Sequence, residues 1–100
     1  PIGYADGLAR NLSNRMDVLA RGSRVRQVGN ICMDQFMIAV DTTGARANKP
    51  VHEICYGDVV TLIGKDGDQE ITVDEMADLR ETINYEVVCN FGARLDKVYI

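Results

Sequence analysis

The sequence lacks a long apolar run. No uninterrupted hydrophobic stretch approaches the roughly 18 to 20 residues that a membrane-spanning helix needs. The chain also does not open on the basic, apolar and small-residue segments of a signal peptide. We therefore expect a cytoplasmic domain that makes no contact with a membrane.

Basic residues are too few and too dispersed to form a nucleic-acid surface. The 11 Lys and Arg residues are outnumbered by 15 Asp and Glu residues, which gives a formal charge of −4 at pH 7. Binding of a phosphate backbone needs a concentrated basic footprint. The composition thus argues against nucleic acid as a partner.

Cysteine and histidine are also scarce. The three cysteines, Cys32, Cys55 and Cys89, are odd in number and widely spaced, which predicts buried free thiols rather than a disulfide framework or a zinc site. The single histidine, His52, lies near no nucleophile pattern, so we expect a solvated loop residue. The sequence therefore predicts neither a metal centre nor a histidine-based catalytic site.

One acidic run imitates a calcium loop without completing it. Asp66, Asp68 and Glu70 match the first ligands of such a loop. Ile71, however, stands where the loop needs Gly, and Ala77 stands where it needs a bidentate Glu. We therefore interpret KDGDQ, residues 65–69, as a hairpin connection.

Short apolar runs separated by glycines make up most of the chain. One hundred residues at 46% hydrophobic content suit one compact domain, which we assign to residues 1–100. Runs rich in Val, Ile, Met and Phe between glycines are typical of strands. The predicted strands span residues 16–21, 23–28, 31–40, 59–64 and 83–91. This pattern predicts a mainly β fold with an antiparallel barrel-like sheet, in which the FMIAV segment is buried on both faces.

One short helix is predicted after the hairpin. Thr72 and Glu75 form a capping-box pattern, and Asp74 adds negative charge to the first turn. The helix should span about residues 73–81, after which a β-branched pair returns the chain to an extended form.

Three motifs combine polar side chains with turns. GYADG, at residues 3–7, is followed by Arg10, GNICMDQFM occupies residues 29–37, and ETINYEV occupies residues 81–87. An Asp-Gly pair alone indicates only a turn. The Asp and Gln of the second motif are costly to bury without partners, so a purely structural strand has little reason to contain them. In this order and at these separations, the motifs resemble the carboxy-terminal domain of bacterial alanine racemases over nearly the whole chain.

The resemblance implies a pyridoxal-phosphate enzyme that interconverts L- and D-alanine for the synthesis of cell-wall peptidoglycan. In that family an amino-terminal α/β barrel holds the cofactor on a lysine, and this β-rich domain completes the active site of a homodimer, partly across the subunit interface. Both catalytic bases, the cofactor lysine and a tyrosine, lie upstream of the matching segment. We therefore expect a small amino acid as the substrate, no catalytic base in residues 1–100, and no racemase activity from this chain alone.

The matching residues have supporting roles in the family. Tyr4, Arg10 and Ile83 match positions along the substrate entrance corridor, where an arginine attracts a carboxylate substrate. The resemblance thus implies that they contribute to substrate binding.

A second group of matching residues lies nearer the cofactor. Cys32, Met33 and Asp34 match a loop presented to the partner subunit's cofactor, where the backbone amide of Met33 would bind the substrate carboxylate. Tyr85 matches a tyrosine near the cofactor phosphate and the inner gate of the site.

Two departures from the family pattern leave alternatives open. Asn30 stands where the family often has Arg, and RLDKVY, residues 94–99, replaces the commoner Arg-Val-Pro-Arg ending. Similar endings occur in serine racemase relatives linked to glycopeptide resistance, so a serine/alanine racemase domain is one alternative. A free-standing β-barrel binding module is another. Tyr85 favours alanine, because a bulky ring at the inner gate leaves less room for a hydroxymethyl group.

Overall fold

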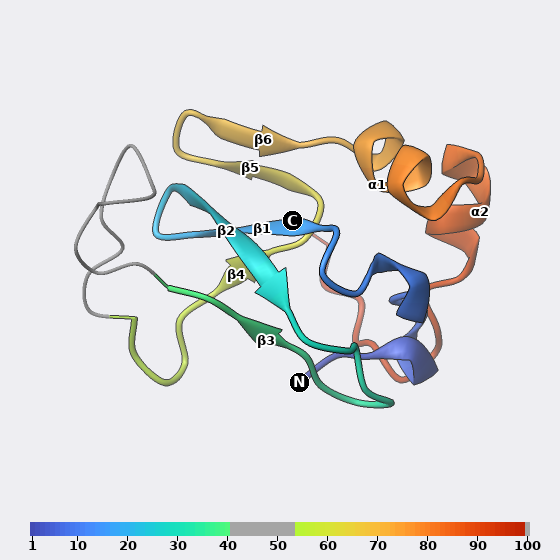
Figure 1. Cartoon of the computed structure of the whole chain (residues 1–100), viewed down its shortest axis with the longest axis horizontal. Coiled ribbons are helices and arrows are strands. Elements are labelled where there is room, and N and C mark those ends of the chain that lie inside the picture. The colour runs from blue at the N-terminus through green and yellow to red at the C-terminus, as the bar shows by residue number, and fades with distance from the viewer. Residues whose placement is uncertain (41–53, 100) are drawn as a thin grey trace.

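The computed structural model describes residues 1–40 and 54–99, and it combines antiparallel strands with helices at one end (Figure 1). The helical elements are the 3₁₀ turns η1 (Tyr4–Asp6) and η2 (Arg10–Leu12) and the α-helices α1 (Val73–Arg80) and α2 (Asn84–Cys89). The strands are β1 (Asp17–Ala20), β2 (Ser23–Val28), β3 (Met37–Ile38), β4 (Val60–Thr61), β5 (Gly64–Asp66) and β6 (Gln69–Ile71). His52, for which we predicted a solvated loop, lies outside the described residues.

Four strands form the main sheet. Their order is β3-β2-β1-β4, and each neighbouring pair is antiparallel. The β1–β2 hairpin turns on Arg21 and Gly22, whose φ angles of 53° and 77° suit the right-handed twist of the flanking strands. The predicted antiparallel β fold class is therefore confirmed.

A second hairpin confirms the prediction for residues 65–69. β5 and β6 pair in antiparallel register around Gly67, which has a φ of 65°. The hairpin lies against β1, and Asp66 Oδ2 accepts the N–H of Gly22 at 2.9 Å. The Asp66 carboxylate thus connects the two hairpins.

The core lies between the main sheet and the helices. Figure 1 shows α1 and α2 gathered at one end of the strands, close to η1 and η2. Alternate residues of β2 point inward, and the helices add their own buried positions. The buried cluster comprises Leu8, Leu12, Met16, Val18, Ala20, Val25, Ile31, Met76, Ala77 and Val87.

The predicted helix is confirmed over Val73–Arg80. Thr72 Oγ1 accepts the N–H of Glu75 at 3.1 Å, which satisfies one of the free donors at the helix start. The Glu75 carboxylate also meets the guanidinium of Arg24 with two contacts of 2.7 Å, which attaches α1 to β2. That arginine lowers the pKa of Glu75 below its ordinary value, although burial partly opposes the shift.

The predicted strand over residues 83–91 is wrong, because residues 84–89 form helix α2. The chain therefore has two α-helices among its described residues, where the sequence predicted one. The Val and Ile residues of this segment suggested a strand, but only Val87 of α2 is buried, and α2 packs against α1. Tertiary packing here overrides the β preference of the side chains.

The strand predicted over residues 31–40 is also much shorter than expected. Only Met37 and Ile38 pair with β2, and Met37 is 63% exposed, so FMIAV is not buried on both faces. Residues 31–36 instead form a loop, in which the N–H of Cys32 donates to the carbonyl of Gln35 at 2.9 Å. Likewise, β4 contains only residues 60–61 of the predicted 59–64, since Gly64 already belongs to the next hairpin.

Candidate substrate-binding surface

The GYADG motif folds as the 3₁₀ turn η1 with a buried carboxylate at its centre. Asp6 is only 2% exposed, and its Oδ2 accepts the N–H of Gly3 at 3.1 Å. Gly7 ends the turn with a φ of 104°, a conformation that favours glycine. The Asp-Gly pair is thus a turn, as its sequence indicates, and the aspartate closes that turn from within.

This turn is joined to the loop of the second motif. The N–H groups of Tyr4 and Ala5 donate to the carbonyls of Cys32 and Met33, both at 3.0 Å. A Cβ atom on Gly3 would lie 2.1 Å from the Cys32 carbonyl oxygen, so the close approach requires glycine at this position. The structure therefore brings together two motifs that are separated in the sequence.

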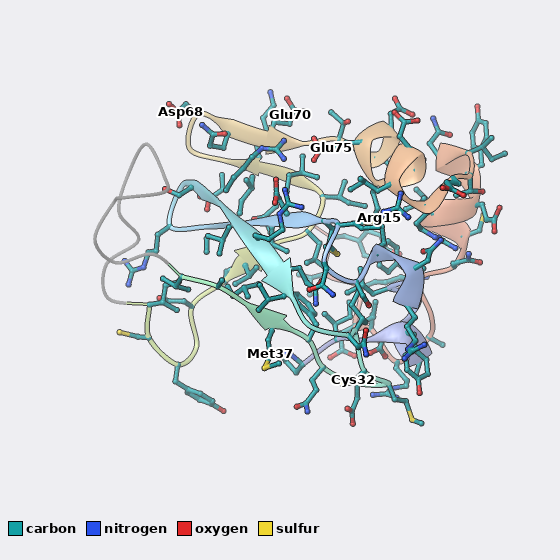
Figure 2. The ribbon with its side chains drawn as sticks, in the orientation of Figure 1. Arg15, Cys32, Met37, Asp68, Glu70 and Glu75 are labelled. Atoms are coloured by element: carbon teal, nitrogen blue, oxygen red, sulfur yellow. The ribbon has the colours of Figure 1, made fainter. Side chains whose placement is uncertain are left out.

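The Met33 loop, residues 32–35, presents its atoms to solvent. Cys32, Met33 and Asp34 are all exposed, and Met33 retains 55% of its accessible surface. The carbonyl of Met33 is bonded to η1, but its N–H has no acceptor among the described residues. Figure 2 shows the Cys32 side chain at the same edge of the molecule as Met37. The loop thus offers a backbone donor at an accessible edge.

Arg10 is connected to the same region through Ser13. The Ser13 hydroxyl donates to the carbonyl of Arg10 at 2.6 Å and accepts the N–H of Ile31, which directly precedes the Met33 loop, at 2.8 Å. The Arg10 side chain is exposed. These bonds link the backbones of Tyr4, Arg10 and the Met33 loop, and we call the three together the loop surface.

A buried glutamine, Gln27, fixes the backbone that leads into the loop surface. Gln27 is fully buried, and its Oε1 accepts the N–H of Asn14 at 2.6 Å. Its Nε2 donates to the carbonyls of Val28 and Gly29, both at 3.0 Å. Asn14 in turn accepts the N–H of Gly29 through Oδ1 at 2.7 Å. These bonds fix the turn through which β2 leads into the Met33 loop.

Ile83 and Tyr85 lie elsewhere, at the start of α2. They border a cavity of about 360 Å³ whose lining includes Asp74 and Asp78 of α1. Tyr85 is 77% exposed, and its hydroxyl has no partner in the part of the chain that the structure describes. No hydrogen bond or ion pair within residues 1–40 and 54–99 joins these two residues to the loop surface. The predicted residues thus form two separate groups.

Two features of the surface were missed or misjudged from the sequence. The three cysteines are free, as predicted, but all are exposed rather than buried. The second feature is an ion pair, in which Asp6 Oδ1 lies 3.1 Å from Arg94 Nε. From the sequence we assigned Arg94 no such role and noted only that residues 94–99 depart from the family pattern. An aspartate that is buried inside a tight turn needs a partner, but no local pattern in the sequence identifies that partner as Arg94.

Two features are absent from the described residues: a metal-binding cluster and a membrane-spanning helix. The part of the chain that the structure describes contains no group of three or more Cys, Asp, Glu or His side chains arranged to hold a metal ion. Across residues 1–40 and 54–99, every helix is too short or too polar to cross a membrane.

Comparison with known proteins points to one family. The family model described as the alanine racemase C-terminal domain matches residues 1–99. The alanine racemase of Synechocystis sp. is 50% identical over 99 residues, which are 99% of this chain and 24% of that protein. The chain belongs to the alanine racemase C-terminal domain family.

Solved structures resemble the fold closely. An alanine racemase from E. faecalis matches with a TM-score of 0.80 and 45% identity over 95% of this chain and 23% of that one. An alanine racemase from Bartonella henselae, with covalently bound pyridoxal phosphate, matches with a TM-score of 0.75 and 34% identity over 99% of this chain and 26% of that one. The chain therefore spans about a quarter of the length of the relatives it matches.

Proposed function

We propose that residues 1–100 act as the carboxy-terminal domain of a pyridoxal-phosphate-dependent alanine racemase, which interconverts L- and D-alanine for peptidoglycan synthesis. The observation that carries the proposal is the N–H of Met33, which has no acceptor among the described residues and is presented on an exposed loop whose carbonyls are fixed by η1. Membership of the racemase domain family supports it. The relatives reported above are alanine racemases, which favours alanine over the serine/alanine alternative.

In this proposal the domain binds and orients the substrate rather than exchanging its proton. The Met33 amide donates to the substrate carboxylate, and a fixed backbone donor loses no side-chain entropy on binding. Cys32 and Asp34 border the same position, while Tyr4 and Arg10 form part of the entrance, where the exposed guanidinium attracts an anionic amino acid. Ile83 narrows the passage from the side of α2. The bases belong to a preceding domain.

Tyr85 is the residue of this chain that fits the cofactor. Pyridoxal phosphate, when bound, withdraws electrons from the substrate and so acidifies its α proton. The Tyr85 hydroxyl is exposed and unpaired among the described residues, as a donor to a phosphate must be. The neighbouring cavity is itself a poor anion site, because Asp74 and Asp78 line it. The proposal therefore rests on the hydroxyl and not on the cavity.

The proposal also includes the assembly and its location. We infer a homodimer in which the loop surface faces the cofactor of the partner subunit, and an amino-terminal barrel domain that precedes this chain. Exposed apolar side chains outside the core, among them Met37, Val59 and Tyr56, support a covered surface in the assembly. Three free, exposed thiols suit the reducing cytoplasm.

A pair of substitutions at Met33 tests the proposal in the full-length protein. Met33→Pro removes the N–H, whereas Met33→Leu keeps it and changes only an exposed side chain. Because a hydrogen bond to a charged group contributes about 1.5 to 3 kcal/mol, Met33→Pro should raise KM for alanine roughly ten- to a hundredfold, while Met33→Leu stays near the parent value.

The measurement is the rate of racemisation of L-alanine and of L-serine, monitored through the loss of optical rotation. Urea unfolding of the cofactor-free proteins controls for damage to the fold by proline. A parent protein that racemises neither amino acid contradicts the proposed reaction. Equal KM values for the two variants contradict the role of the amide, and a preference for serine supports the alternative substrate.

A further inference from the structure

The buried carboxylate of Asp6 has two partners, and one of them comes from the far end of the chain. Oδ2 accepts the N–H of Gly3 within the turn, and Oδ1 lies 3.1 Å from Nε of Arg94. The carboxylate is almost completely removed from water, while the Arg94 side chain stays 58% exposed. A buried carboxylate is tolerated when both oxygens are paired, so the arginine satisfies a need that the turn creates.

The segment after α2 meets η1 at two more points. The N–H of Gly92 donates to the carbonyl of Asp6 at 2.9 Å. A Cβ atom on Gly7 would lie 2.0 Å from the carbonyl oxygen of Asn90, so the two backbones pass in direct contact. The turn is therefore held on one side by residues 90–94 and bonded on its other side to the Met33 loop through Tyr4 and Ala5.

We propose that Arg94 is a positioning residue for substrate binding, acting through Asp6 and η1 on the Met33 loop. The inference deepens the proposed function and rests on it. Without the guanidinium, one oxygen of Asp6 stays buried and unpaired, and the turn relaxes to expose that oxygen to water. The N–H bonds of Tyr4 and Ala5 to the loop carbonyls then weaken, and the Met33 amide loses its fixed place.

This pair differs from an ordinary surface ion pair. Arg26 lies 2.9 Å from Asp17 across the β1–β2 hairpin, and both of those side chains contact water. Exposed pairs of that kind contribute little, because water solvates each partner once the other is removed. No hydrogen bond or ion pair among the described residues joins Arg26 to η1, so Arg26→Ala is the matched control for Arg94→Ala.

The test uses the full-length protein with Arg94→Ala, Arg94→Lys and Arg26→Ala. Hydrogen–deuterium exchange is followed in peptides that cover residues 1–8, with residues 17–26 as the reference. We expect Arg94→Ala to speed exchange of the Tyr4 and Ala5 amides roughly fivefold or more while the reference changes little. Arg94→Lys keeps a cation near Asp6 and should restore most of the protection.

The kinetic readout is how the effect of each substitution is distributed between KM and kcat. Arg94→Ala should raise KM for alanine about tenfold and lower kcat less, because displacement of a binding group costs affinity first. Arg94→Lys should recover most of the affinity, and Arg26→Ala should leave both constants unchanged.

Three results overturn the inference. They are unchanged exchange in residues 1–8, an equal acceleration of exchange in all peptides, and an unchanged KM in an active Arg94→Ala protein. If the parent protein racemises no alanine, the proposed function fails, while the exchange data still decide whether Arg94 holds the turn and its loop.

Discussion

Burial decides what each arginine–carboxylate pair of this chain contributes. Asp6 is enclosed, so loss of Arg94 leaves a carboxylate that water does not reach. Glu75 and Arg24 are each about one third exposed, so water solvates either group when the other is removed. At the scale of single residues, we therefore expect loss of the Asp6–Arg94 pair to change the shape of the loop surface. Loss of the Arg24–Glu75 pair should lower only the stability of the fold.

Tyr85 is the residue that we propose contacts the cofactor phosphate. Tyr85→Phe in the full-length protein removes the hydroxyl and keeps the ring, so the fold should be preserved. A hydrogen bond to a charged phosphate contributes on the order of 1.5 to 3 kcal/mol, so pyridoxal phosphate should bind roughly ten- to a hundredfold more weakly. Spectroscopic titration of the cofactor-free protein measures the affinity. An unchanged affinity, with unchanged thermal stability, removes Tyr85 from the site.

Among the elements, α1 is attached to the sheet by the Arg24–Glu75 pair. The pKa of Glu75 is lowered by Arg24. A carboxyl group with a lowered pKa in the folded state stabilises the fold above its ordinary pKa, and this stabilisation is lost as the pH falls through the lowered value. The acid-sensitive window therefore begins near pH 4.5 and extends downward.

Glu75→Gln should lower the free energy of unfolding by about 1 kcal/mol at pH 7, a value already reduced for the partial exposure of both side chains. The difference from the parent should shrink as the pH falls below about 4.5, where Glu75 of the parent becomes protonated. Urea unfolding of the chain between pH 7 and pH 3 measures both effects. Thr72→Ala, which removes the helix cap, is the control whose cost should not depend on pH. If the difference in unfolding free energy between the parent and Glu75→Gln stays constant with pH, the ion pair does not stabilise the fold.

Elements with local signals could be predicted from the sequence, and elements fixed by distant contacts could not. The β5–β6 hairpin and α1 have their turn and capping residues next to them in the chain. α2 has no such cap, since Ile83 precedes it without a side-chain hydrogen bond, and its place depends on packing against α1. The Met33 loop is likewise fixed by η1, which lies far away in the sequence.

The same reasoning applies to the candidate site. The residues of the loop surface could be identified from motifs that resemble a known family. The pairing of Asp6 with Arg94 could not, because no local pattern relates a turn at the beginning of the chain to a segment at its end. The exposure of Cys32 also follows from the loop, which the strand prediction concealed.

At the scale of the whole molecule, we propose that the chain supplies binding groups and that the catalytic bases lie in a preceding domain. The loop surface contributes one backbone donor, an exposed guanidinium and an exposed tyrosine ring, and the other group lies at the start of α2. Because the described contacts do not join the two groups, we propose that the preceding domain and the partner subunit bring them to the cofactor. The domain then acts as a rigid support for chemistry carried out elsewhere.

The central claim is that this chain completes a racemase and does not catalyse racemisation by itself. The most direct measurement compares the 100-residue chain with the full-length protein, each mixed with pyridoxal phosphate and L-alanine. D-alanine is then quantified, and borohydride reduction followed by digestion reveals any lysine that carries the cofactor. The account predicts D-alanine and one labelled lysine from the full-length protein, located upstream of this segment, and neither from the chain alone. Turnover by the chain, with stoichiometric labelling of one of its own lysines, would contradict the account.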